Sequence, residues 1–477
     1  MDNIRFKSRP VSIPEDNPFK EDLLGRQESA AVLTDLVTSL SEPFVLSIDS
    51  PWGTGKTTFL KMWLQQLRNQ NVPCLQFNAW ENDFSDEPLV SLVGELGAAI
   101  DAMKLPESQT ETAKRLYEKA KKAGARIISA TVPTMLKMAT YGILDVSEQS
   151  EGAIADLASD IAKQRIERYE ADKNTISQFK EDLRGLVDAL SKKNGGEKNS
   201  PVVFVIDELD RCRPTYAISL LEKIKHLFSV EGLVFVLAID RKQLGESIKA
   251  LYGAIDDDGY LRRFIDLEYR LPEPDNRKFS VALFDRFSLD ETLDAKPGDT
   301  SHDSESIREF IPKMFSLFEF SLRVQEQCFT QLAIVLKTTP ANNFLYGVLL
   351  VLLLCLRSKN RVLYVRYCTG KATPNDVLEY LSKLPGGQEF VQSDAGCIVE
   401  AHLVKGVSNE DVRRRLQSQY ANVMKAEPPN EASQRASRVY ELFRYIGRNS
   451  RSMTEYLYKK IEISHRFVRP EKKPQMV

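Results

Sequence analysis

The stretch Ser50-Pro51-Trp52-Gly53-Thr54-Gly55-Lys56-Thr57, followed by Thr58, decides the fold of this chain. It matches the phosphate-loop pattern G-x-x-x-x-G-K-[ST] at every fixed position except the first, where serine replaces glycine. The two glycines let backbone N–H groups converge on phosphate oxygens, and a following helix adds its positive N-terminal end. Lys56 supplies a mobile charge for the β- and γ-phosphates, and the Thr57 hydroxyl is suited to Mg²⁺. We therefore predict that residues 50–58 bind ATP together with Mg²⁺.

The residues on both sides of this loop have the patterns that the motif requires. Residues 43–49, PFVLSID, are short and apolar, which is typical of a buried parallel strand. Residues 57–70 carry apolar side chains at helical spacing. Strand, loop and helix thus follow in the order that a phosphate site needs, whereas a chance glycine-lysine turn lacks that context.

A second motif follows another apolar run, residues 203–206 (VFVI), which leads to Asp207 and Glu208. In parallel sheets of this kind, the carboxyl edge of such a strand faces the phosphate loop. A first carboxylate there holds the Mg²⁺ shell, and a second orients or deprotonates the attacking water. We therefore assign Asp207 to the metal, together with Thr57, and assign Glu208 and Lys56 to catalysis.

The remaining pattern predicts two domains, because 477 residues exceed the usual size of a single core. Further strand-like runs occur at residues 72–80, 201–207, 233–240 and 264–272, which indicates a parallel sheet. Residues of about 96–200 alternate charged and apolar side chains, as long amphipathic helices do. We expect an α/β NTPase domain at residues 1–275 with this helical insertion, and a C-terminal α-helical domain at residues 276–477.

The amino-acid composition excludes only a few classes of function. The formal net charge of −2 gives no reason to expect a polyanionic partner. Six scattered cysteines without a C-x-x-C pair and four dispersed histidines argue against zinc or a disulfide framework, so we expect any metal to be bound through oxygen. The N-terminus lacks the apolar run of a signal peptide, and we expect a cytoplasmic protein.

Two apolar stretches raise the question of a membrane. Residues 344–356, FLYGVLLVLLLCL, are too short for a span of about 20 residues, and a buried core helix is the better interpretation. Residues 127–144 are longer but contain Lys137 and Pro133, both costly in a spanning helix. We expect a packed or amphipathic segment there, with peripheral membrane contact left open.

Several polar residues near these motifs have more than one interpretation. Asp240 ends the apolar run 233–240 and is suited to sense the γ-phosphate, to hold Arg241 or to cap the strand end. Asn78, at the end of the run 72–80, is placed to reach the nucleotide, whereas we expect Trp80 in the core. Arginines that are candidates for contacting phosphate, in cis or from a second subunit, are Arg211, Arg262 and Arg263.

The motifs together resemble the KAP family of P-loop NTPases. The specific segments are W-G-x-G-K-T-T at residues 52–58, F-N-A-W at residues 77–80 and I-D-E-L-D-R-C at residues 206–212. D-L-L-G-R at residues 22–26 is similar to the N-terminal segment of the family, which is expected near the nucleotide base. The resemblance covers roughly residues 15–275, including A-I-D at 238–240 and Y-L-R-R-F at 260–264, and continues in a helical stretch at 321–332.

The resemblance implies an additional-strand (ASCE-type) P-loop ATPase, in which an extra strand separates the phosphate-loop strand from the strand that ends at Asp207. Asp207 and Glu208 then occupy the Walker B pair, and Asp210 and Arg211 complete the family signature. The pair is usually two aspartates, and the glutamate here favours hydrolysis. Many members carry membrane spans between the Walker motifs, for which residues 127–144 are the candidate here. Bacterial members often belong to mobile elements and phage defence.

Three functional hypotheses follow from these observations. The leading one is an ATP-driven conformational switch, with a homo-oligomer or an effector protein encoded nearby as partner. The second is a nucleic-acid-stimulated motor or sensor, and the third is a membrane-associated scaffold controlled by nucleotide. The second uses arginines and aromatic residues of the C-terminal region, although a solvated helix face with aromatic residues in the core is the stronger interpretation of them. They are Arg413, Arg414, Arg415, Arg435, Arg438, Arg444, Arg448, Arg451, Tyr440, Phe443 and Tyr445.

Overall fold

The chain forms two compact units in a computed structural model. One unit comprises Ser12–Pro272, and the other joins Met1–Val11 to Glu273–Val477. The sequence places residues 1–275 together, but the backbone N–H groups of Arg5 and Arg9 donate to carbonyls in the second unit. The domain boundaries expected from the sequence therefore stay a proposal. The structure describes residues 4–102, 107–131, 151–191, 200–294, 301–340, 343–425, 430–446 and 453–462.

The described part of the first unit contains a five-stranded sheet with the strand order β2-β3-β4-β1-β5. All four pairings are parallel, which confirms the predicted sheet. Because β4 lies between β1 and β3, an additional strand separates the phosphate-loop strand from the strand that ends at Asp207. The strands are β1 (Phe44–Asp49), β2 (Cys74–Asn78), β3 (Val202–Asp207), β4 (Leu233–Ile239) and β5 (Leu267–Arg270).

The register of the strands brings polar residues to one edge of the sheet. Asp49 pairs with Ile239 across β1 and β4, so Asp240 follows at the same level. Asn78 pairs with Asp207 across β2 and β3. The carboxyl ends of four neighbouring strands therefore end in or next to a polar side chain, at the edge where ligands bind in open parallel sheets.

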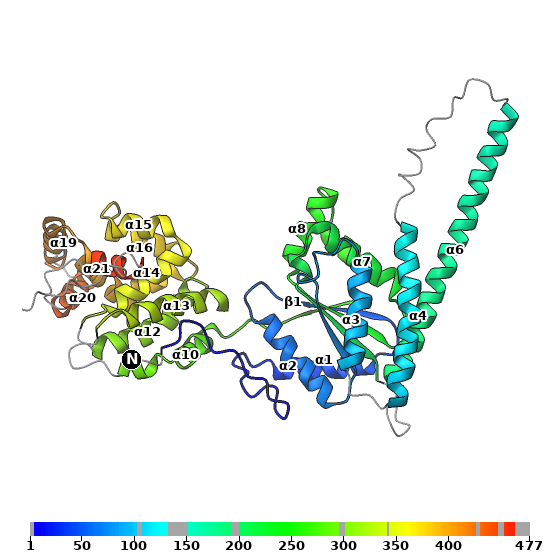
Figure 1. The fold of residues 1–477 in the computed structure, drawn as a ribbon. Coiled ribbons are helices and arrows are strands. Elements are labelled where there is room, and N and C mark those ends of the chain that lie inside the picture. Colours follow the sequence, from blue (N-terminus) through cyan, green and yellow to red (C-terminus); the bar gives the residue numbers. More distant parts are fainter. Residues whose placement is uncertain are drawn as a thin grey trace, which may run out of the picture. The chain divides into compact units, whose positions relative to one another are not determined.

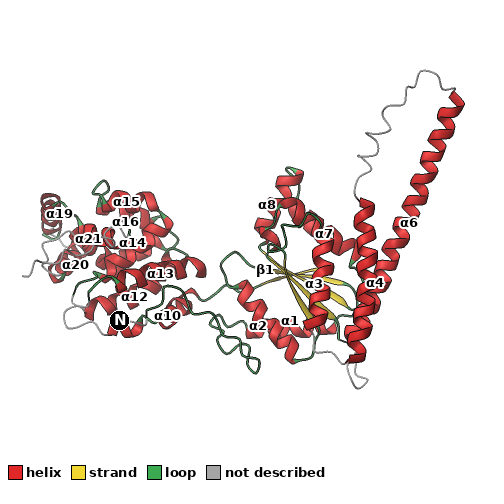
Figure 2. Cartoon of the chain, viewed as in Figure 1, coloured by secondary structure: helices red, strands yellow, loops and turns green. Residues whose placement is uncertain are grey.

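Helices cover both faces of the sheet, as Figures 1 and 2 show. On one face lie α1 (Gln27–Ser39) and α2 (Lys56–Asn69), which are joined by a hydrogen bond of 2.9 Å from Trp63 Nε1 to Thr34 Oγ1. On the other lie α7 (Pro214–Leu227) and α8 (Arg241–Tyr252). Alternate residues of β3 face each layer, because side chains alternate along a strand. Both faces are thus buried, which explains the continuous apolar strands.

The insertion between β2 and β3 is helical wherever the structure describes it. It contains α3 (Pro88–Ala102), α4 (Glu107–Thr131) and α6 (Glu151–Ser191), which confirms the predicted helical insertion. α4 lies alongside α6 (Figure 1). The C-terminal part of α6 packs into the core of the sheet through Phe179 and Leu183, so the insertion is anchored at its base.

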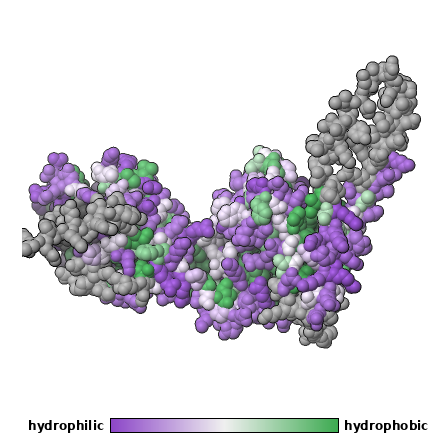
Figure 3. Space-filling view, in the orientation of Figure 1, coloured by the Kyte–Doolittle hydropathy of each residue, from purple (hydrophilic) through white to green (hydrophobic). Residues whose placement is uncertain are grey.

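The described residues of Glu273–Val477, in the second unit, are mostly helical, as predicted. In α14 every residue from Gly347 to Leu356 is buried, which confirms the core helix predicted at residues 344–356. Hydrophilic residues cover most of the visible surface in Figure 3, with apolar residues showing only in small areas. The helices are α10 (Asn276–Arg286), α11 (Asp290–Asp294), α12 (Ser301–Leu317), α13 (Leu322–Lys337), α14 (Gly347–Lys359), α15 (Arg361–Cys368), α16 (Pro374–Ser382), α17 (Gly387–Gln392), α18 (Asp394–Gly406), α19 (Glu410–Val423), α20 (Glu431–Tyr445) and α21 (Met453–Ile461).

We predict that Leu353→Ala destabilises the helical unit. Leu353 lies on α14 and is 0% exposed, so its truncation removes apolar burial and leaves a cavity. Such changes lower the free energy of unfolding by about 2–5 kcal/mol. Urea denaturation followed by circular dichroism measures the change. Val362→Ala on the neighbouring α15 is the control, because Val362 is 71% exposed; equal effects of the two substitutions would contradict the assigned core.

Candidate functional site

The loop of residues 50–55 joins β1 to α2 and requires glycine at two points. Gly53 has φ 77° and Gly55 has φ 85°, a left-handed conformation that strains residues with a side chain. Gly55 is also the N-cap of α2, so the loop ends at the N-terminus of a helix of 14 residues. The backbone geometry is therefore that of an anion-binding loop ahead of a helix.

Ser50, the one departure from the phosphate-loop pattern, has a structural role in this loop. Its hydroxyl contacts the Thr54 hydroxyl at 2.5 Å, and Thr54 Oγ1 donates to the Pro51 carbonyl at 2.8 Å. The backbone N–H of Ser50 donates to Ile239 O at 3.1 Å, which fixes the start of the loop to β4. A serine here thus closes the loop through its hydroxyl. Thr58 lies partly buried in the first turn of α2.

The structure brings the phosphate loop and the end of β3 into direct contact. Thr57 Oγ1 donates to Asp207 Oδ2 at 2.8 Å, although the two residues are 150 positions apart. Beside this pair, Lys56 Nζ donates to the carbonyl of Ser50 at 3.0 Å. Lys56 and Asp207 are both buried, at 9% and 2% exposed. A hydroxyl, a carboxylate and an ammonium group therefore meet at the carboxyl edge of the sheet.

Burial controls the electrostatics of this cluster. It lowers the pKa of Lys56, because the charged ammonium is desolvated, while surrounding carboxylates oppose the change. Burial raises the pKa of Asp207, and the hydrogen bond from Thr57 opposes that increase. Burial likewise raises the pKa of Asp210, opposed by the charge of Lys56. The carboxylates that act on Lys56 are Asp210, Asp207, Asp240 and Asp49.

Glu208 has an unusual backbone and two polar neighbours. Its φ of 61° is left-handed, which is uncommon for a residue with a side chain. Its Oε1 is 2.7 Å from Arg211 Nη1, and its Oε2 accepts from Asn78 Nδ2 at 3.3 Å. The side chains of Glu208 and Arg211 are 15% and 23% exposed. Arg211 is carried by the short helix η1 (Leu209–Arg211), so a turn after β3 and the end of β2 hold the glutamate together.

Trp52 connects the phosphate loop to the acidic residues beyond it. Its backbone N–H donates to Asp240 Oδ2 at 3.1 Å, and its indole Nε1 donates to Asp210. The guanidinium of Arg211 lies 6.0 Å from the Trp52 ring and 5.6 Å from the Trp80 ring. Trp80 is 53% exposed, so the prediction that it lies in the core is wrong. The ring is placed at the surface because the chain turns directly after β2.

Two aspartates at strand ends cap helix α8. Asp240 accepts from the backbone N–H of Gln243 at 3.2 Å and is thus the N-cap of the helix that follows the strand. Asp49 accepts from the backbone N–H of Arg241 at 2.9 Å. The guanidinium of Arg241 binds elsewhere, to Asp258 and Glu268, so Asp240 does not hold it. Asp49 is a member of the site that sequence reasoning missed, since an aspartate at the end of a strand is too common to signal a role.

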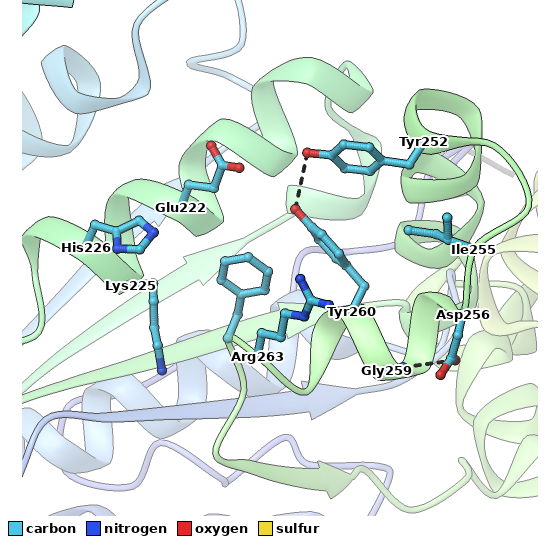
Figure 4. Close-up of a pocket in the computed structure, with 10 residues that line it drawn as sticks. Glu222, Lys225, His226, Tyr252, Ile255, Asp256, Gly259, Tyr260 and Arg263 are labelled. Carbon is cyan, nitrogen blue, oxygen red and sulfur yellow. Dashed lines mark hydrogen bonds between the residues drawn. The ribbon is translucent and has the colours of Figure 1, made fainter.

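Arg263 lies in a separate hollow of the first unit (Figure 4). Its guanidinium is 5.8 Å from the Tyr260 ring, in a cavity of about 810 Å³ between α7 and the segment that follows α8. Three residues further on, Asp266 binds Val45 at the N-terminal end of β1, the end opposite to the phosphate loop. Arg262 beside it is exposed. The structure therefore brings Arg211, but not Arg262 or Arg263, to the cluster around Lys56.

The segment of residues 22–26 forms a compact turn next to the end of β5. Asp22 accepts hydrogen bonds from the backbone N–H groups of Leu24, Arg26 and Gln27. Arg26 is 1% exposed and donates from Nη2 to the carbonyl of Pro272 at 3.1 Å. Burial lowers the pKa of Arg26 to about 10. The motif thus fixes the chain ahead of α1 to the edge strand of the sheet.

The family of the chain follows from a family model. The model for the KAP family P-loop domain matches residues 26–339, which include the whole sheet, the phosphate loop and the acidic residues at the end of β3. The chain belongs to the KAP family of P-loop NTPases. The match continues past the sheet through α13, so the family domain includes the first helices of the second unit. A P-loop NTPase domain is a nucleotide-binding fold.

Two relatives share part of the chain. The phage T7 exclusion protein of Escherichia coli (strain K12) is 20% identical over 268 residues, which cover 55% of this chain and 34% of that protein. An uncharacterised protein of Methanocaldococcus jannaschii is 26% identical over 179 residues, covering 35% of this chain and 91% of that protein. The matched region thus spans about a third of the length of the exclusion protein.

Three solved structures show low similarity to this chain. The Aeropyrum pernix ORC2 protein, in ADPNP-ADP complexes, is 11% identical with a TM-score of 0.29, covering 92% of this chain and 93% of that chain. Cdc6p from Pyrobaculum aerophilum is 14% identical with a TM-score of 0.33, covering 96% and 97%. The Aeropyrum pernix ORC1 protein in complex with DNA is 11% identical with a TM-score of 0.29, covering 93% and 94%. The fold assignment depends on the family match and on the sheet.

The described residues include no helix that is both long and apolar enough to cross a membrane. Of the candidate segment at residues 127–144, the first five residues form the end of α4. Residues 132–144 lie outside the described residues.

We predict that the thiol of Cys212 is unreactive in the native protein. Cys212 follows the acidic motif after β3, and burial, with nearby carboxylates, raises its pKa to about 12. Since only the thiolate reacts readily, iodoacetamide at pH 8 should leave Cys212 unmodified. Mass spectrometry of the tryptic peptide measures this, with urea-unfolded protein as the control. Alkylation of native Cys212 as fast as in the unfolded chain would contradict the site geometry.

Proposed function

We propose that this chain binds ATP together with Mg²⁺ and hydrolyses the nucleotide. The contact that carries the proposal is the one between the phosphate loop and the end of β3, where Thr57 Oγ1 is 2.8 Å from Asp207 Oδ2. Lys56 lies in the same cluster, with its Nζ inside the loop. A helix N-terminus, glycine-dependent backbone amides and a lysine are the groups that bind a triphosphate.

The charges around Lys56 fit a divalent cation. Four buried or partly buried carboxylates act on the ammonium group of Lys56. Among the described residues, negative charges therefore outnumber positive charges around this group. Asp210 Oδ1 is buried without a hydrogen-bond partner. A threonine hydroxyl and an aspartate carboxylate are oxygen ligands of the type that magnesium prefers, and Thr57 and Asp207 would hold it. Bound Mg²⁺ supplies positive charge to the phosphate oxygens.

Other residues of the site bind the phosphates and activate the attacking water in this proposal. The backbone of residues 50–55 and the charge of Lys56 hold the phosphates, and Thr58 in the first turn of α2 extends that surface. Glu208, the carboxylate next to Asp207, orients the attacking water and accepts its proton. Glu208 is held by Asn78 and Arg211, so its carboxylate has a defined place beside the end of β3.

We further propose that the nucleotide cycle drives a conformational switch in anti-phage defence. The support is the similarity to the phage T7 exclusion protein, of which this chain covers 34%. A switch requires two states with different affinity for the nucleotide, and Trp52 offers a route between them because it joins the phosphate loop to Asp210 and Asp240. An effector protein encoded nearby or further copies of the chain are the proposed partners, in the cytoplasm.

The nucleic-acid hypothesis gains little from the C-terminal arginines. Arg435 forms an ion pair with the buried Glu400, and Arg438 forms one with Asp394. Arg413 donates to the carbonyl of Val407, and Arg414 pairs with Glu410 on its own helix. These contacts favour a role in the packing of α18 to α20. Arg448 and Arg451 lie outside the described residues.

We predict that Lys56→Ala lowers ATP turnover by about 100-fold or more, because it removes a preorganised charge on the phosphates. Release of inorganic phosphate from Mg-ATP measures turnover, and a fluorescent ATP analogue measures binding. Lys61→Ala on the same helix is the matched control, since Lys61 is exposed and is not among the buried residues of α2. Unchanged turnover in Lys56→Ala, or loss in both variants, would refute the assignment.

We also predict that protection against phage depends on the nucleotide site. The wild-type gene, expressed with its neighbouring genes in Escherichia coli, should lower the plating efficiency of phage T7, whereas Lys56→Ala should restore it. Immunoblots control for equal protein levels. If wild type and variant plate alike, whether both protect or neither does, ATP-dependent phage exclusion is not the function of this chain.

A further inference from the structure

The guanidinium of Arg211 lies near three side chains, which come from the acidic motif, the phosphate loop and the segment after β2. It forms an ion pair of 2.7 Å with Glu208 and lies near the rings of Trp52 and Trp80. Each ring is within about 6 Å of the guanidinium, the range in which cations attract aromatic faces. We propose that Arg211 is a positioning residue that holds the Glu208 carboxylate for the attack of water and links it to the phosphate loop. This inference rests on the proposed hydrolysis with Glu208 as the base.

The backbone conformation of Glu208 shows why its side chain needs a positioning residue. A left-handed φ of 61° is unfavourable for glutamate and persists only where surrounding contacts determine it. Arg211 and Asn78 supply those contacts, one to each carboxylate oxygen. A base held by two partners on different elements has few alternative rotamers, which is the condition for efficient proton transfer.

The ion pair differs from an ordinary surface pair. Exposed pairs contribute little because water and salt screen them. Here both side chains are less than a quarter exposed, and the guanidinium is bordered by two indole rings. The ion pair engages Nη1 of Arg211 with the carboxylate of Glu208. In this proposal, the effect of Arg211 on the reaction therefore passes through that carboxylate.

Trp52 extends this link to the nucleotide. Trp52 belongs to the phosphate loop, and its indole Nε1 donates to Asp210, the residue before Arg211. A shift of the loop when phosphates bind would therefore move both the acidic turn and the ring beside the guanidinium. Trp52 and Trp80 are 44% and 53% exposed, whereas tryptophan is highly buried on average.

The test compares Arg211→Gln, Arg211→Lys and Glu208→Gln, alone and combined, with Arg184→Gln as control. Arg184 is an arginine of the same unit whose side chain is 53% exposed. Arg211→Gln should lower kcat by about ten-fold or more, because positioned acid–base catalysis contributes about 10²–10⁴-fold. The Kd for ATP should stay within about two-fold, because the phosphate loop keeps its own contacts. Arg211→Lys keeps the charge and should recover part of kcat.

The decisive measurement is the double variant. If Arg211 acts through Glu208, Arg211→Gln should change nothing further in the Glu208→Gln background, measured as residual turnover of radiolabelled ATP. A normal or raised kcat in Arg211→Gln, an additive loss in the double variant or weakened ATP binding overturns the inference. Thermal unfolding checks that each variant is folded. If Arg211→Gln is not folded, the kcat of Arg211→Lys decides the inference.

Failure of the proposed function gives a different result. If the wild-type chain does not hydrolyse ATP, or Glu208→Gln hydrolyses it at the wild-type rate, the proposed function is wrong and the role of Arg211 falls with it. If the wild type is active and Glu208→Gln is inactive, the proposed function stands, and the effect of Arg211→Gln alone decides the inference.

Discussion

The site depends on one contact, the hydrogen bond between Thr57 Oγ1 and Asp207 Oδ2. It exists because β1, β4 and β3 are parallel and in register, so that the phosphate loop and the acidic turn leave the sheet at the same edge. A shift of one residue in either pairing would turn the side chains of that strand to the other face. The apolar packing of both faces of the sheet holds the register, and the register holds the site.

The second constraint is the charge at this edge. A buried ammonium is costly unless charges of opposite sign surround it, and Lys56 has four carboxylates around it. Two of these, Asp49 and Asp240, also cap α8, so they serve the fold and the site together. Asp210 and Glu208 are held by Trp52 and Arg211. The acidic groups therefore have fixed places at this edge of the sheet.

Sequence patterns predicted the positions of helices and strands more accurately than they predicted the surroundings of individual side chains. The run at residues 201–207 is apolar throughout because β3 is buried on both faces, and this property is local. The prediction for Trp80 was wrong for this reason. A large aromatic residue after a strand usually packs inward, yet here the ring lies beside Arg211 at the surface. Arg263 was equally ambiguous, because nothing in its neighbours along the chain shows to which end of the sheet it belongs.

The sequence by itself determined the phosphate loop, the five strands, the helical insertion and the family, because glycine requirements and hydrophobic periodicity act over a few residues. Only the tertiary structure decided which groups meet at the site. Trp52 binds Asp210 and Asp240 from 158 and 188 positions away, and such partners depend on the strand order rather than on any local pattern. Asn78 joins the local pair of Glu208 and Arg211 for the same reason, because β2 lies beside β3.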